Sequence, residues 1–221
     1  MVSLYEIRER QLHTGFLRGS GAVLRLLGLK RANVPASWRR AAIALTPRHG
    51  FKSDWLEGLG RFMALAVGGL SPGDRAPSFK IATDAGETMS SARLKGSPYV
   101  VYFYPKDDTS GCTKEAIGFS DSLKKFEKLG VTVLGISKDS VESHAKFRKK
   151  HKLKIVLGSD PEIKMAKDWG VWGEKTLYGR KYMGMERATF LVNAKGVIAQ
   201  AWRKVKVPGH VEAVLQASGA L

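Results

Sequence analysis

Residues 99–104 read YVVYFY, an unbroken apolar and aromatic run that Pro105 ends. Such a run has no polar face, which indicates a central strand covered by other layers on both sides. An amphipathic helix is predicted to follow, because Phe119, Leu123 and Phe126 recur at helical spacing while lysines occupy the opposite face. A strand of this kind, joined to a helix, favours an α/β domain built in layers.

The elements expected after residue 63 complete this arrangement. They are a pair of short strands around a turn at 84–86, the strand at 99–104, a helix at 112–129, a strand at 131–137, a helix at 140–151, an extended segment at 154–160, a short helix begun by Pro161, a hairpin at 188–202 and a closing helix at 208–217. Strands joined by helical crossovers, followed by a hairpin and a helix, predict a thioredoxin-like three-layer α/β sandwich with a mixed central sheet.

The use of basic residues changes near residue 63. Residues 1–62 contain nine Arg and two Lys, whereas residues 63–221 contain six Arg and twenty Lys. We therefore predict a basic, Arg-rich N-terminal extension over 1–62 and a folded domain over 63–221. The extension has three readings: an organellar transit peptide, a basic extension without a targeting role, or upstream sequence translated ahead of a true start at Met63.

The chain has a formal net charge of +17 and a pI near 10.1, which would suit an anionic partner. No zinc-finger spacing, glycine-rich phosphate loop or aromatic RNA-binding motif accompanies this charge, so we expect no specific nucleic-acid partner.

No segment approaches the roughly 18 apolar residues that span a bilayer, and a soluble protein is expected. A single cysteine cannot form an internal disulfide, which favours a reducing compartment. We expect a cytoplasmic protein, or an organellar one if residues 1–62 are a transit peptide.

Cys112, the only cysteine, lies where the buried strand, a loop and the start of a helix meet. Unpaired N–H groups and the dipole at a helix N-terminus stabilise an anion and therefore favour a thiolate. Thr109 precedes it by three residues, where a dithiol oxidoreductase would have a second cysteine, so the spacing favours attack by a lone thiolate. The alternative is that Cys112 is a small core hydrophobe. Because polar and small residues flank it, we expect solvent to reach the site.

Three stretches resemble one family. They are YFYPKDDTSGCTKEA, VLGISKDSVESHAKF and MGMERATFLV, and they are similar to the bacterioferritin comigratory protein branch of the peroxiredoxins. The likeness runs through nearly all of residues 70–217. It implies a thioredoxin-like fold, a thiol peroxidase activity without a cofactor, and an active site formed by Pro105, Thr109, Cys112 and Arg187.

The resemblance also implies a role for each of these residues. The Cys112 thiolate attacks one oxygen of hydrogen peroxide or an organic hydroperoxide and becomes a sulfenic acid. Arg187 hydrogen-bonds both oxygens while charge moves across the O–O bond, and Thr109 holds the peroxide in line. Pro105 shapes the pocket and keeps it dry. Without the resemblance, Arg187 could equally be a surface arginine paired with a carboxylate such as Glu186.

The sequence departs from many relatives at Ile117, where they have a second, resolving cysteine. The sulfenic acid must therefore be reduced by an external thiol: thioredoxin, a glutaredoxin or a small thiol such as glutathione.

The family resemblance also implies that the protein is a monomer. His144 and His151 share a helix but lack further ligands at metal-binding spacing, so no metal site is expected. The competing hypothesis is a basic thioredoxin-fold binding or chaperone module with an incidental thiol.

Overall fold

The computed structural model describes residues 69–177 and 179–221. The predicted extension over 1–62 and the boundary at residue 63 lie outside these residues. The strands are β1 (Lys80–Thr83), β2 (Thr88–Ser90), β3 (Tyr99–Phe103), β4 (Thr132–Ser137), β5 (Val156–Ser159), β6 (Trp172–Leu177), β7 (Arg180–Met185), β8 (Ala188–Val192) and β9 (Ile198–Trp202). The helices are α5 (Ser110–Lys128), α6 (Val141–His151), α7 (Lys164–Asp168) and α8 (His210–Ser218).

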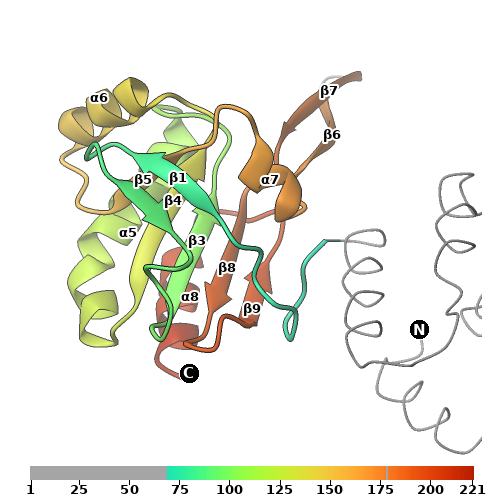
Figure 1. The fold of residues 1–221 in the computed structure, drawn as a ribbon. Helices are drawn as coiled ribbons and strands as arrows, with labels where there is room; N and C mark the ends of the chain where they lie inside the picture. The colour runs from blue at the N-terminus through green and yellow to red at the C-terminus, as the bar shows by residue number, and fades with distance from the viewer. Residues whose placement is uncertain (1–68, 178) are drawn as a thin grey trace, which may run out of the picture. The chain divides into compact units, whose positions relative to one another are not determined.

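Seven strands form one sheet in the order β2-β1-β5-β4-β3-β8-β9 (Figure 1). Strands β3, β4 and β5 are parallel, and the other pairings are antiparallel. The prediction of a mixed sheet is therefore confirmed. The two parallel pairings are connected by α5 and α6, since parallel neighbours need a crossover connection.

Helices cover both faces of the sheet. One face packs against α5, α6 and α8 in a core that includes Tyr102, Phe119 and Val214. The opposite face packs against α7 and the segment before β1, around the fully buried Trp169. Every residue of β3 is buried, as its two-sided apolar pattern predicted. This central position fixes the end of β3, from which the loop to α5 departs.

The structure adds a two-stranded sheet that the sequence patterns did not predict. Strands β6 and β7 pair with each other and project from one end of the domain (Figure 1). Most β7 residues are exposed, so the hairpin lacks the buried alternating face that marks a strand in sequence. The short helix α7 also begins at Lys164 instead of Pro161, after Ile163 takes a left-handed backbone conformation with φ of 53°.

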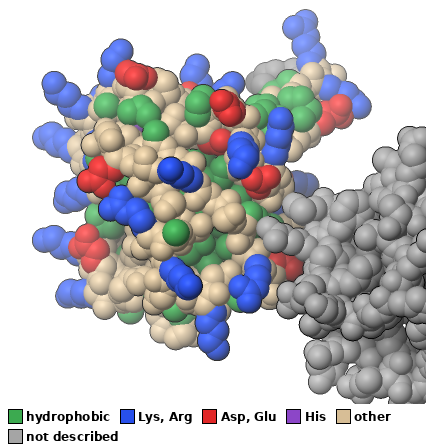
Figure 2. Space-filling model, viewed as in Figure 1, with side chains coloured by type: hydrophobic (Ala, Val, Ile, Leu, Met, Phe, Trp, Pro, Cys, Tyr) green, Lys and Arg blue, Asp and Glu red, His purple; other side chains and the backbone are tan. Residues whose placement is uncertain are grey.

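Lysine and arginine side chains are spread over the visible face of the domain, with acidic side chains among them (Figure 2). Within the described part of the chain, none of the helices combines the length and the apolar character needed to cross a bilayer.

Candidate active site

The connection from β3 to α5 places Cys112 in the first turn of a long helix. Thr109 is the N-cap residue of α5, with φ of −89° and ψ of 149°, and its carbonyl accepts a hydrogen bond of 2.8 Å from the Thr113 N–H. Cys112 follows within the turn whose N–H groups have no partner inside the helix. The helix dipole is therefore directed so that it stabilises negative charge near the sulfur.

The sulfur is less accessible than the sequence suggested. Cys112 is 1% exposed, whereas Lys106, Thr109 and Ser110 are exposed around it. The expectation that solvent reaches the thiol is thus wrong for this conformation. The reason is that the side chain packs into the core cluster beside Tyr104, while the polar flanking residues face outward.

Arg187 lies against the sulfur. Strand β8 runs antiparallel to β3 with Ala188 opposite Phe103, so the residue before β8 lies next to the loop that follows β3. The Nη2 group of Arg187 donates a hydrogen bond to the Cys112 Sγ at 3.1 Å. Gly111 leaves room for this guanidinium, because a Cβ at that position would lie 3.3 Å from Nη2.

A third residue, Glu115, completes the cluster and was missed by the sequence analysis. The Nη1 group of Arg187 donates a hydrogen bond to Oε2 of Glu115, which is fully buried. Glu115 follows Cys112 by three residues, and this i,i+3 spacing on a helix was a signal that could have revealed it. The carboxylate suggested for Arg187, Glu186, instead binds Arg203 at 2.6 Å.

The charges of this cluster are coupled. Burial raises the pKa of Glu115 to about 7, although Arg187 opposes this shift. Burial lowers the pKa of Arg187, but Glu115 and Cys112 outweigh it and the net shift is upward. The guanidinium therefore stays protonated beside the sulfur, and it is paired with a carboxyl group whose pKa burial has raised.

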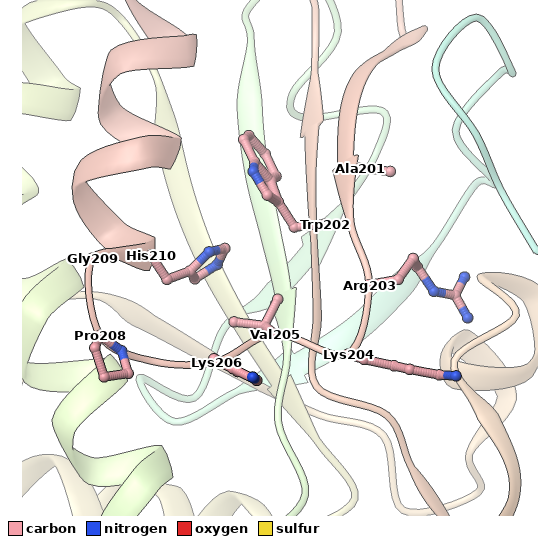
Figure 3. Close-up of a pocket in the computed structure, with 9 residues that line it drawn as sticks. All are labelled: Ala201, Trp202, Arg203, Lys204, Val205, Lys206, Pro208, Gly209 and His210. Atoms are coloured by element: carbon pink, nitrogen blue, oxygen red, sulfur yellow. The ribbon is translucent and has the colours of Figure 1, made fainter.

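A pocket of about 410 Å³ lies between the end of β9 and the start of α8 (Figure 3). It is lined by residues 201–206 and 208–210, so the Cys112 sulfur does not form part of its wall. His210 connects the two, because its Nε2 lies 2.8 Å from the Thr189 hydroxyl and 4.0 Å from Oε1 of Glu115. Burial lowers the pKa of His210 to about 4, so the imidazole is neutral at physiological pH.

The other two predicted site residues lie on the loop before Cys112. Thr109 is exposed, and its hydroxyl donates a hydrogen bond of 3.1 Å to the Lys106 carbonyl. Pro105 is half-buried directly after Tyr104. The structure therefore brings Cys112 and Arg187 into direct contact, with Thr109 one turn away at the helix start and Pro105 at the beginning of the loop.

No cluster of three or more potential metal ligands occurs within residues 69–177 and 179–221. His144 and His151 each lie instead beside an aspartate of the loop between β3 and α5. His144 contacts Asp107 at 2.9 Å, and His151 contacts Asp108 at 2.7 Å.

Comparisons with known proteins agree with this fold. The sequence profile described as the AhpC/TSA family matches residues 72–201. The putative peroxiredoxin Bcp of Coxiella burnetii is 50% identical over 143 residues, which cover 65% of this chain and 95% of the relative. Peroxiredoxin Bcp of Bacillus subtilis is 46% identical over 144 residues, covering 65% and 92%. A solved structure of Xanthomonas campestris Peroxiredoxin Q has a TM-score of 0.62 and 42% identity, and it covers 64% of this chain and 90% of its own.

A thioredoxin-like domain with these relatives is a thiol peroxidase, an oxidoreductase that reduces peroxide and uses thiols as the reductant. The chain belongs to the AhpC/TSA family, in the bacterioferritin comigratory protein branch of the peroxiredoxins. The family resemblance stated from the sequence is confirmed, and the hypothesis of a binding or chaperone module with an incidental thiol is not favoured.

Proposed function

We propose that Cys112 is the thiol that attacks peroxide and that Arg187 stabilises the charge that moves in this reaction. The observation that carries this proposal is the 3.1 Å contact between Arg187 Nη2 and the Cys112 Sγ at the N-terminus of α5. A guanidinium and a helix N-terminus, both directed at one sulfur, favour the thiolate form that acts as the nucleophile.

The reaction balances with these groups. The Cys112 thiolate attacks one peroxide oxygen, an S–O bond forms, and the O–O bond breaks. The leaving oxygen departs as hydroxide or alkoxide and takes up a proton to become water or an alcohol, which leaves a sulfenic acid on Cys112. Arg187 can donate to both oxygens while negative charge passes from sulfur to the leaving oxygen.

Thr109 and Pro105 are proposed to place the substrate. Thr109 is exposed at the start of the helix that carries Cys112, and its hydroxyl donates to the Lys106 carbonyl, so its oxygen can accept a hydrogen bond from an incoming peroxide. Pro105 adds no N–H donor to the loop, and its apolar ring would help to shape the site that receives the peroxide and keep it dry. Because Cys112 is 1% exposed, substrate entry requires the surrounding side chains to move apart.

Organic hydroperoxides are proposed as substrates alongside hydrogen peroxide. A solved structure of the Xanthomonas campestris bacterioferritin comigratory protein, with a TM-score of 0.62 and 41% identity, concerns that protein's alkyl peroxide reduction activity. The test compares rates of Cys112 oxidation by hydrogen peroxide and by an alkyl hydroperoxide. Oxidation of Cys112 by both peroxides at rates far above those of free cysteine is expected, and ordinary thiol reactivity would contradict the proposal.

The reductant is proposed to be an external thiol, and the protein to act as a monomer. Cys112 is the only cysteine, so neither this subunit nor a second copy can supply a resolving thiol. One thiol condenses with the sulfenic acid to give a mixed disulfide and water, and a second thiol then releases reduced Cys112. Turnover measured with thioredoxin, a glutaredoxin and glutathione separately identifies the physiological class, and sedimentation at working concentration tests the monomer.

Replacing Ile117 with cysteine is expected to create an intrachain disulfide after oxidation. In the parent, the sulfenic acid should persist long enough to be trapped by a dimedone-type reagent, and excess peroxide should convert it to sulfinic acid. Cys112 is buried and Ile117 is exposed on the same helix, so disulfide geometry requires α5 to unwind locally. Mass spectrometry after one equivalent of peroxide should find the disulfide in Ile117→Cys and not in the matched control Ile117→Ser. If the variant accumulates only sulfinic acid, α5 does not unwind.

The division of the chain near residue 63 remains a prediction. The family match begins at residue 72, so a chain starting at Met63 contains the whole matched region. We expect this shortened protein to keep full peroxidase turnover and nearly the same midpoint of thermal unfolding as the full chain. Loss of solubility or activity would mean that residues 1–62 belong to the domain. The predicted cytoplasmic location and its organellar alternative both depend on the role of this extension.

A further inference from the structure

The loop between β3 and α5 contains a buried aspartate that the peroxidase mechanism does not use. Asp107 is 7% exposed, whereas Lys106 and Asp108 on either side are exposed. Burying a carboxylate costs free energy unless it is paired or fully hydrogen-bonded. The surroundings of Asp107 therefore show what the loop is built against.

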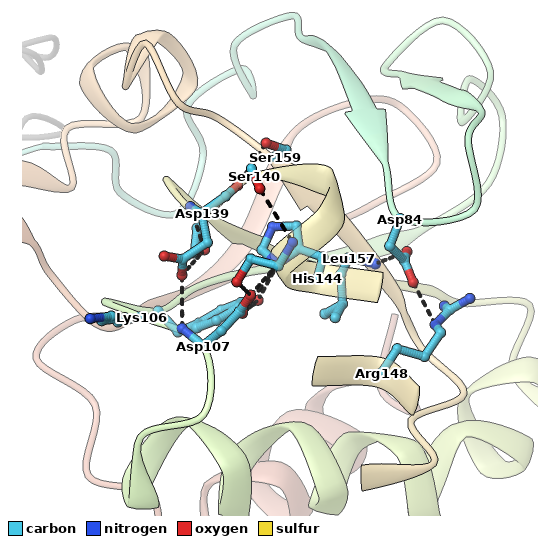
Figure 4. Close-up of polar contacts among 12 residues, drawn as sticks. Asp84, Lys106, Asp107, Asp139, Ser140, His144, Arg148, Leu157 and Ser159 are labelled. Carbon is cyan, nitrogen blue, oxygen red and sulfur yellow. Dashed lines mark hydrogen bonds and ion pairs between the residues drawn. The ribbon is translucent and has the colours of Figure 1, made fainter. Parts of the chain in front are cut away.

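Three side chains satisfy this carboxylate. The Tyr104 hydroxyl donates to Oδ1 at 2.8 Å, the Ser143 hydroxyl donates to Oδ2 at 2.8 Å, and His144 Nδ1 lies 2.9 Å from Oδ2. The backbone N–H of Asp107 donates to the Asp139 carboxylate at 2.8 Å (Figure 4). Burial raises the pKa of Asp107, but the hydrogen bonds and charge of these partners outweigh it, and the pKa lies below its usual value.

Helix α6, which carries Ser143 and His144, is itself held against the sheet. His144 is fully buried in α6, and its second ring nitrogen, Nε2, lies 3.3 Å from the Gly158 carbonyl of β5. One turn further along α6, Arg148 pairs with the buried Asp84 at 2.6 Å (Figure 4). His144 thus connects the loop to a fixed element of the fold.

The anchored aspartate lies immediately before the catalytic turn. The Lys106 carbonyl, one residue ahead of Asp107, accepts the hydrogen bond from the Thr109 hydroxyl. Thr109 in turn begins the helix whose first turn carries Cys112. A shift of Asp107 would therefore move both the residue proposed to hold the peroxide and the start of the helix that stabilises the thiolate.

We propose that Asp107 and His144 are positioning residues for the peroxidase reaction. The pair holds the segment 106–109 and the first turn of α5 at the place where the Thr109 hydroxyl and the Cys112 sulfur meet the peroxide. This inference rests on the proposed roles of Cys112 and Thr109. Neither Asp107 nor His144 touches the sulfur, so their effect is geometric, and a displacement of about 1 Å at a reacting group is enough to slow a reaction on the order of a hundredfold.

The test measures oxidation and reduction of Cys112 separately in folded variants. His144→Phe keeps an aromatic ring and removes both nitrogens, and Asp107→Asn keeps the size and removes the charge. In each, sulfenic acid formation in a single turnover with peroxide should slow by about tenfold to a hundredfold. Reduction of the preformed sulfenic acid by a small thiol should change less than about threefold, because Thr109 is needed only to hold the peroxide. The double variant should be slowed by less than the product of the two single effects, since the two residues share one contact.

His151→Phe is the comparison variant, because His151 lies on the same helix and contacts the neighbouring Asp108 in an exposed pair, which should hold the loop far less than the buried pair does. It should oxidise at a rate within about twofold of the parent. If His144→Phe does not fold, Asp107→Asn and Ser143→Ala carry the test, and the latter removes one hydroxyl donor from the same carboxylate. Parent-like oxidation rates in folded Asp107→Asn and Ser143→Ala would overturn this inference alone. A parent protein that is not oxidised at Cys112 would instead overturn the proposed function.

Discussion

Cys112→Ser is expected to reduce peroxidase turnover to the uncatalysed background. A serine hydroxyl remains protonated near neutral pH, so the variant lacks the anionic nucleophile even though the side chain has nearly the same shape. Arg187 can still donate to the oxygen that replaces the sulfur, and we expect the free energy of unfolding to change by about 1 kcal/mol. Peroxide consumption in the presence of excess thiol, measured beside thermal unfolding, checks both results. Retained turnover in the folded variant would show that Cys112 is not the reacting group.

Arg187→Gln is expected to slow oxidation of Cys112 by a factor on the order of 10²–10³, the usual cost of losing one donor to developing charge. Single-turnover oxidation with peroxide measures this effect. The variant also leaves Glu115 buried without its cation, so a loss of stability accompanies the loss of activity. A second substitution is needed to separate the two effects.

The double variant Arg187→Gln, Glu115→Gln provides that separation. The folded-state pKa of Glu115 is raised to about 7, above the 4.5 of an unperturbed glutamate, so the unfolded chain releases this proton first as pH rises. Stability therefore falls between these two values, and without Arg187 the folded pKa should rise further and extend the loss to higher pH. Urea unfolding at pH 6 and pH 9 should show a larger destabilisation of Arg187→Gln at pH 9. The double variant should recover stability at pH 9 while its oxidation stays slow. Recovery of fast oxidation would mean that Arg187 acts only by neutralising Glu115.

The agreement between sequence and structure is closest where a pattern is local. The buried run at 99–104 became the central strand β3, and the helical spacing of Phe119 and Phe126 became α5. The turn at 193–196 joins β8 and β9 as expected. Each of these features depends on residues that are neighbours in the chain, so their periodicity reports directly on the faces they bury. The β6–β7 hairpin lacks such a buried face, and its pattern gave no comparable signal.

The candidate site divides in the same way. The sequence by itself placed Cys112 at a helix N-terminus after a buried strand, because strand, loop and helix are consecutive. Family resemblance, not periodicity, pointed to Arg187. Only the tertiary structure decided that Arg187 contacts the sulfur across 75 positions of sequence, that its carboxylate partner is Glu115, and that Asp107 is buried against His144. These contacts follow from the antiparallel pairing of β8 with β3 and from the packing of α6 against β5. Neither arrangement can be read from the local periodicity of the chain.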